Sequence, residues 1–153
     1  MGLKEKINED LKGAMKSRDE FTIGTLRFLL SSVQSKEIEN RGKGLGETLT
    51  EEEVAEVLKK EAKKRRESFE VYTRGGRNDL ADKEKQELNL ITSYLPPEMS
   101  DGDLEKIVDE AIAAVRPAGP QDFGKVMGEA MKRAKGTADA SRVSRMIKQK
   151  IGN

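Results

Sequence analysis

Residues 123–153 read FGKVMGEAMKRAKGTADASRVSRMIKQKIGN, and this closing stretch decides the fold of the chain. From Phe123 to Ala134 the apolar residues recur at the i, i+3, i+4 and i+7 spacing of one helix face. Gly136 interrupts this pattern, and Asp139 is predicted to be the N-cap of a second helix. Two short amphipathic helices joined by a glycine turn are therefore expected. The inner face of the second helix would consist of Val143, Met146, Ile147 and Ile151.

The same stretch is strongly basic. It holds eight basic and two acidic residues, a net charge of +6, whereas the whole chain carries +1. Residues 97–122, just before it, hold two basic and seven acidic residues, so opposite charges are segregated along the chain. A basic helix pair attracts polyanions such as RNA, although a solvated helix surface without a ligand explains the same residues. The predicted RNA-binding residues are Lys125, Lys132, Arg133, Lys135, Arg142, Arg145 and Lys148.

Helical periodicity also runs through the chain before this stretch, and no strand pattern stands out. We predict an all-α protein with an N-terminal bundle of about four helices, residues 1–96, and a smaller three-helix domain, residues 97–153. The boundary is placed at Pro96-Pro97 because two prolines cannot continue a helix. In the helix predicted over residues 21–38, Phe21 and Phe28 lie opposite the main apolar face, so this helix is expected to be covered on both sides.

Two further helix starts are predicted from capping residues. Thr50 with Glu53 three residues later forms a capping box at the start of a long helix, and Asp79 is expected to cap the next helix, residues 80–95. The long helix carries a possible second basic patch, which nearby glutamates could neutralise. The residues of this patch are Lys59, Lys63 and Arg66.

Charged residues also fall inside the apolar stripes of these two helices. Arg65 on the first should face Glu87 on the second, with Glu61 and Glu84 close by. Burying one such charge alone would cost several kcal/mol, so a mutual ion-pair network is predicted. A functional acidic pocket is the alternative.

The composition restricts what the chain can catalyse. It has no His and no Cys, so it lacks the usual general base at neutral pH and a thiolate nucleophile. No nucleotide-binding loop and no metal-ligand pattern stand out. We therefore predict no catalytic residue, no cofactor and no metal, and a protein that is not an enzyme by itself. The absence of a secretory or membrane-spanning segment predicts a cytoplasmic protein that does not bind membranes.

Two motifs of the closing stretch resemble a known module. Residues 124–131 and 135–139 are similar to the tail domain of the B subunit of the tRNA-dependent amidotransferase, which is shared with the stand-alone YqeY family. Most members have Pro where this chain has Ala140, a mild departure. Further motifs of the YqeY family occur near the N-terminus and before Pro96, so the resemblance covers the whole chain. The charged residues of this chain that match the family's motifs are Arg27, Arg65, Arg77, Asp79, Glu84 and Glu87.

The resemblance implies two all-α domains and a link to tRNA-dependent amidation, because the amidotransferase tail touches tRNA. Members carry a carbon–nitrogen ligase label with glutamine as amido-N-donor on that basis. Three hypotheses follow. The chain is a non-catalytic accessory module that binds tRNA or another folded RNA, or a protein-binding helical adaptor with no RNA role, or a subunit of an amidotransferase whose catalytic groups lie on other chains. With only 4% aromatic residues, recognition of RNA by shape is favoured over stacking on single-stranded bases.

Overall fold

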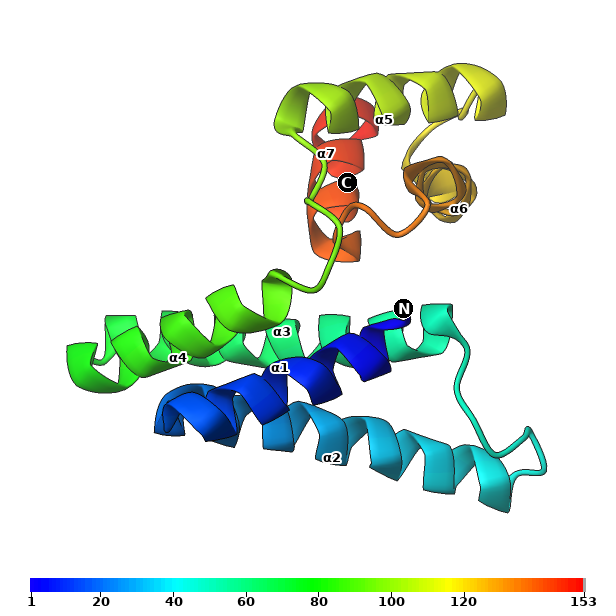
Figure 1. Cartoon of the computed structure of the whole chain (residues 1–153). Coiled ribbons are helices and arrows are strands. Elements are labelled where there is room, and N and C mark those ends of the chain that lie inside the picture. The colour runs from blue at the N-terminus through cyan, green and yellow to red at the C-terminus, as the bar shows by residue number, and fades with distance from the viewer. Residues whose placement is uncertain (153) are drawn as a thin grey trace. The chain divides into compact units, whose positions relative to one another are not determined.

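The computed structural model describes residues 1–152, and the chain is helical along this range, with no strand (Figure 1). The prediction of an all-α protein is confirmed. Contacts between residues divide the chain into two compact units, Met1–Leu95 and Pro96–Asn153. These are called unit 1 and unit 2, and each is described by itself.

Unit 1 contains four α-helices and a core of aliphatic side chains. The helices are α1 (Leu3–Ser17), α2 (Glu20–Gly42), α3 (Glu51–Arg74) and α4 (Asn78–Thr92). Helix α1 packs along α2, α3 packs along α4, and α3 also contacts α1 and α2. The core forms because each helix turns one apolar stripe inward. Its fully buried side chains include Ile7, Leu26, Leu29, Leu58 and Ile91.

The helix starts of unit 1 follow the predicted capping residues in one case and differ in another. The capping box at Thr50 is confirmed, since the Thr50 and Glu53 side chains each accept a hydrogen bond from the other's backbone N–H, at 3.2 and 2.8 Å. The prediction for Asp79 is wrong. Arg77 occupies the N-cap position of α4, and Asp79 lies in the first turn, 3.4 Å from the Arg77 side chain. An acidic residue is favourable there because it faces the positive end of the helix dipole.

Helix α2 is not covered on both sides, contrary to expectation. Phe21 and Phe28 are 36% and 47% exposed, whereas Leu26 and Leu29 on the opposite side are fully buried. The other three helices of unit 1 bury one side of α2, and no helix of this unit lies on the other side (Figure 1). Periodicity identified the two faces correctly but could not show that no helix of this unit packs along the second one.

Unit 2 contains α5 (Asp101–Val115), a short 3₁₀ turn η1 (Pro120–Asp122), α6 (Phe123–Ala134) and α7 (Ala140–Ile151). Ser100 caps α5 by accepting a hydrogen bond from the Asp103 backbone N–H. The carbonyl of Thr137, in the turn between α6 and α7, accepts a hydrogen bond from the Met99 backbone N–H at 2.8 Å. The segment just before α5 is thereby tied to the turn between α6 and α7. The core of unit 2 includes the fully or almost fully buried side chains of Leu104, Val108, Val126, Val143 and Ile147.

Candidate nucleic-acid interface

The α6–α7 pair has the predicted form. Helix α6 ends where Lys135 and Gly136 both adopt positive φ, at 50° and 76°, which reverses the chain. Glycine adopts this conformation without steric cost, so Gly136 suits the turn. Asp139 occupies the N-cap position of α7, but its side chain makes no capping hydrogen bond. The apolar stripes of both helices face α5, and this leaves the basic side chains at the rim and on the outer surface.

Three basic residues of α6 and α7 form ion pairs with acidic side chains of α5 or of the residues just before it. Arg133 lies 3.4 Å from Glu110, and it also pairs with Glu129 on its own helix at 3.0 Å. Lys150 lies 2.8 Å from Asp109 and 3.1 Å from Glu105. Hydrogen bonds to Asp109 and then to Glu105 raise the pKa of Lys150. The acidic segment that precedes the basic stretch therefore neutralises part of its charge.

Arg142 is the most firmly held of the three. Its guanidinium donates to the Met99 carbonyl at 2.9 Å and to Asp101 at 2.7 Å, and it lies 3.7 Å from Glu98. These contacts fasten the start of α5 to α7. The structure thus gives Arg142 an architectural role, which sequence reasoning missed although the segregation of charge pointed to such pairing.

The other predicted RNA-binding residues are more exposed and less engaged in ion pairs within the chain. Lys132, Lys135 and Arg145 are exposed and have no ion-pair or hydrogen-bond partner for their side chains within residues 1–152. Lys125 is also exposed and lies 3.8 Å from Asp122, a long and weak pairing. The Lys148 ammonium lies 5.6 Å from the centre of the Phe123 ring.

The available lysines of α6 share one helix side with two glycines. At 100° per residue, Gly124, Lys125, Gly128 and Lys132 fall within one side of α6, opposite the buried Val126 and Ala130, and Lys135 follows at the C-cap of the helix. All five are exposed, and a Cβ atom at Gly124 or Gly128 would meet no other atom within 4 Å. Packing within the described part of unit 2 therefore does not account for these glycines. We call these five residues the α6 basic face.

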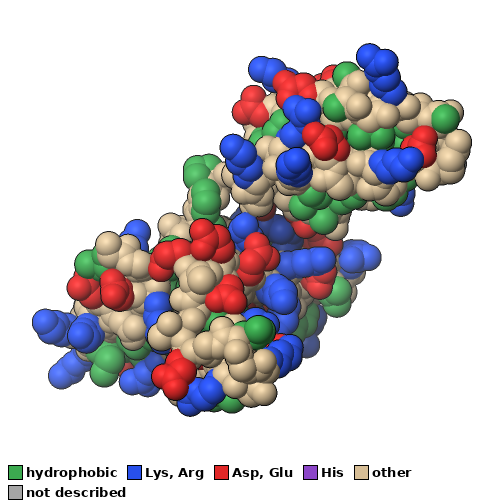
Figure 2. Space-filling model, turned by 90° about the vertical axis from the view of Figure 1, so that its right-hand side faces the viewer, with side chains coloured by type: hydrophobic (Ala, Val, Ile, Leu, Met, Phe, Trp, Pro, Cys, Tyr) green, Lys and Arg blue, Asp and Glu red, His purple; other side chains and the backbone are tan. Residues whose placement is uncertain are grey.

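The proposed second basic patch on α3 is less open. Lys59 is half-buried and lies 3.5 Å from Glu56, and Arg66 is half-buried as well, whereas Lys63 is exposed. Figure 2 shows that, on the face it presents, unit 1 carries both Asp and Glu and Lys and Arg side chains. A surface of mixed charge produces a weaker field than a continuous basic surface.

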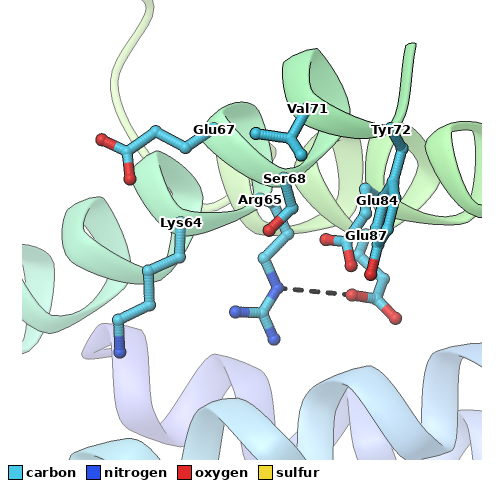
Figure 3. A pocket seen from close by; sticks show the side chains of 8 residues that line it. All are labelled: Lys64, Arg65, Glu67, Ser68, Val71, Tyr72, Glu84 and Glu87. Atoms are coloured by element: carbon cyan, nitrogen blue, oxygen red, sulfur yellow. Dashed lines mark hydrogen bonds and ion pairs between the residues drawn. The ribbon is translucent and has the colours of Figure 1, made fainter. Parts of the chain in front are cut away.

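The charged cluster of unit 1 surrounds Arg65 (Figure 3). Its guanidinium lies 2.6 Å from Glu61 and 3.3 Å from Glu87, so the predicted pairing with Glu87 is present. It also stacks over the Phe28 ring, 4.5 Å from the ring centre, an interaction that the sequence did not reveal. Glu61 is buried and additionally lies 3.2 Å from Lys64. These partners show how charged side chains are accommodated beside an apolar core.

Arg65, Glu84 and Glu87 line a groove between α3 and α4 with a volume of about 550 Å³ (Figure 3). Glu84 has no ion-pair partner within residues 1–152. Burial, and then the negative charge of Glu87, raise its pKa above 4.5. Arg77 pairs with Asp79 at the exposed turn between α3 and α4, and Arg27 is exposed on α2. The structure therefore brings Arg65, Glu84 and Glu87 together, while none of the ion pairs described here joins Arg27 or Arg77 to them.

The described residues offer little for other kinds of site. No group of three or more acidic side chains in residues 1–152 is arranged to hold a metal ion. None of the helices in this range is sufficiently long and apolar to cross a membrane. What the fold and its surface define is an all-helical protein of two units, with a basic helix side on the second.

This class is matched by a known family. The family model described as Yqey-like protein matches residues 4–151, and the chain belongs to this family. The resemblance inferred from the sequence motifs is thereby confirmed.

Three similar proteins are all named "Altered inheritance of mitochondria protein 41, mitochondrial". The protein of Lachancea thermotolerans is 28% identical over 74% of this chain and 60% of its own length. That of Pyrenophora tritici-repentis is 28% identical over 96% of this chain and 80% of its own. That of Candida glabrata is 30% identical over 82% of this chain and 71% of its own.

These relatives correct one expectation. A cytoplasmic location was predicted from the absence of a targeting segment, whereas the names of these relatives place them in mitochondria. The cytoplasmic assignment is wrong by this comparison. The reasoning failed because location was inferred from a default and not from a residue pattern.

Proposed function

We propose that this chain is a non-catalytic accessory module that binds tRNA, and that it is linked to tRNA-dependent amidation. The α6 basic face is the observation that carries the proposal. It combines available lysines with two exposed glycines, and each glycine costs roughly 1 kcal/mol of helix propensity compared with alanine. A ligand backbone that approaches the helix closely gives both features a purpose. Folded RNA offers such a backbone, with one phosphate for each nucleotide.

The pairing pattern refines which residues should contact RNA. Phosphate contacts are assigned to Lys125 and Lys132 on α6, to Lys135 at its C-cap, and to Arg145 and Lys148 on α7. Arg133 and Arg142 are assigned to the framework, because their guanidinium groups already bind carboxylates of unit 2. The amidation link rests on the family resemblance of the tail, and the chain supplies no catalytic group of its own.

Binding of the full chain to bulk tRNA, with duplex DNA as competitor and across a salt series, tests the proposal. We expect a preference for tRNA and a log K that falls by several units per log unit of salt. Replacing Lys132, Lys135 and Arg145 by Ala should lower the salt slope by roughly one for each phosphate that is no longer neutralised.

A matched control removes the same charge elsewhere. Replacing Lys4, Lys36 and Lys43 by Ala also removes three positive charges, but these side chains pair with Glu37 or Glu39 in unit 1. If both triple variants weaken binding equally, the effect is one of net charge and the proposed interface is wrong. Equal binding of tRNA and duplex DNA, only at low salt, would also refute it.

The amidation link has a separate assay. Added to the catalytic chains of a glutamine-dependent amidotransferase, the protein should raise amidation of mischarged tRNA. The variant with Lys132, Lys135 and Arg145 replaced by Ala should not. A protein-binding adaptor remains the alternative function. It predicts a defined protein that co-purifies after nuclease treatment while tRNA binding is absent.

A further inference from the structure

The outermost side of α2 carries no charged residue from Phe21 to Ile38, although 37% of the chain is charged. All of its positions are exposed, with Phe28 at 47% and Ile38 at 58%. The solvent side of a helix in a soluble protein is normally its charged side. Here the charges lie at the flanks instead. The residues of this side, called the α2 seam, are Phe21, Gly24, Phe28, Ser31, Ser35 and Ile38.

The spacing of the α2 seam indicates what covers it. Its residues alternate in steps of three and four, which is the a/d pattern of a helix that packs along another helix. The seam lies opposite the buried Leu29 and Val33, so it does not belong to the core of unit 1. A helix is therefore the expected occupant.

A second copy of α2, running antiparallel, fits the seam in size. About a two-fold axis near the middle of the seam, Phe28 faces Ser31 of the second copy and Phe21 faces its Ile38. Each large side chain near the axis then meets a small one, as interdigitated packing requires. Self-complementarity of this kind is the property of a two-fold interface.

The flanking charges favour the same arrangement. Glu20 and Arg41 are both exposed, and neither side chain has an ion-pair partner within residues 1–152. An antiparallel pair brings Glu20 beside Arg41 of the second copy, at both ends of the seam. A parallel pair would leave these residues about 30 Å apart along the axis and would place each seam residue against itself.

We infer that the α2 seam is a self-association surface, through which two copies of this chain pair antiparallel along α2. The inference does not depend on RNA binding, because it concerns unit 1 and an uncharged surface. The chain is small and contains no cysteine, which makes the geometry accessible to sedimentation and to cross-linking.

Sedimentation equilibrium of the full chain tests the surface. The wild-type chain should show a concentration-dependent monomer–dimer equilibrium below about 1 mM. Ser31→Glu should weaken dimerisation at least tenfold, because it buries two charges near the axis. Phe28→Glu should do the same, but this ring also contacts Arg65, so Ser31→Glu is the variant that tests the seam alone. Gln86→Glu on α4 adds the same charge at another exposed position and should leave the dimer unchanged.

Two further experiments test the direction. Glu20→Arg should weaken the dimer, and the double variant Glu20→Arg with Arg41→Glu should restore it. With a short bifunctional thiol reagent, Ser31→Cys should cross-link, whereas Ile38→Cys should not, because an antiparallel pair holds the two Ile38 positions about 25 Å apart. A chain that stays monomeric, a dimer insensitive to Ser31→Glu, or cross-linking through position 38 would overturn the inference.

Discussion

Replacing Arg65 by Ala should destabilise unit 1 by about 3 kcal/mol. The Arg65 side chain is 13% exposed and the Glu61 side chain is 7% exposed, so this ion pair is largely removed from water. Breaking a buried pair by removing one partner typically costs about 3–5 kcal/mol. The lower end applies here because Glu61 keeps its pairing with Lys64 at 3.2 Å, and Glu87 is 17% exposed.

The natural assay is urea unfolding of the full chain followed by tyrosine fluorescence. Tyr72 and Tyr94 are the two tyrosines of the chain, it has no Trp, and both lie in unit 1, so the signal reports on the unit that contains the cluster. A fall in the transition midpoint at constant slope would give the decrease in free energy of unfolding.

Two control variants separate the explanations. Lys64→Ala removes a charge that is 67% exposed and should cost no more than about 1 kcal/mol. Replacing Arg65 and Glu61 together by Leu should recover part of the stability, because the buried Glu61 carboxylate is removed together with its partner and only Glu87, which is 17% exposed, then lacks an ion pair. A cost below about 1 kcal/mol for Arg65→Ala would refute the argument that this pair is effectively buried.

Three further predictions concern single side chains of unit 1. Burial and then Glu87 raise the pKa of Glu84, so above pH 4.5 the folded state binds more protons than the unfolded state, and stability falls as pH rises through that region. Glu84→Gln should therefore stabilise the unit at pH 7 and lose this advantage below pH 4.5, as measured by urea titrations. Tyr94→Phe removes a 2.6 Å hydrogen bond to Asp10 and should lower the free energy of unfolding by about 1–2 kcal/mol, as measured by thermal unfolding. Burial and this hydrogen bond raise the pKa of Tyr94, so its ultraviolet titration should lie well above pH 10.0, and a normal titration would contradict the hydrogen bond. Thr50→Ala breaks the capping box and should cost about 1 kcal/mol by the same measurement, whereas Thr50→Ser should be nearly neutral.

The fold was largely predictable because the helices are specified by patterns of residues close together in the sequence. The stripe that begins at Phe123 defined α6, and the capping box at Thr50 defined the start of α3. Both depend on residues within one or two helical turns. Asp79 was misplaced because acidic residues are favourable both at the N-cap and in the first turn, so composition alone does not separate these positions.

The candidate interface was less predictable because it depends on which helices meet. Sequence counted Arg142 among the RNA-binding residues, and the fold places it against the Met99 carbonyl and Asp101. The stripe positions of Arg65 and Glu87 did predict their pairing, since antiparallel neighbours joined by a short turn have a defined register. No comparable rule existed for Phe28, whose neighbour Arg65 comes from a helix distant in the sequence.

The pairing of the basic residues with α5 has a consequence for any dissolved polyanion that would compete for them. The carboxylates of Glu105, Asp109 and Glu110 act toward Lys150 and Arg133 as anions that cannot diffuse away. A tethered competitor has an effective concentration in at least the millimolar range, independent of how dilute the protein is. A dilute polyanion in free solution therefore displaces them poorly, while Lys132 and Lys135 face no such competitor. Helix α5 thus leaves only part of the positive charge of α6 and α7 accessible to phosphate groups.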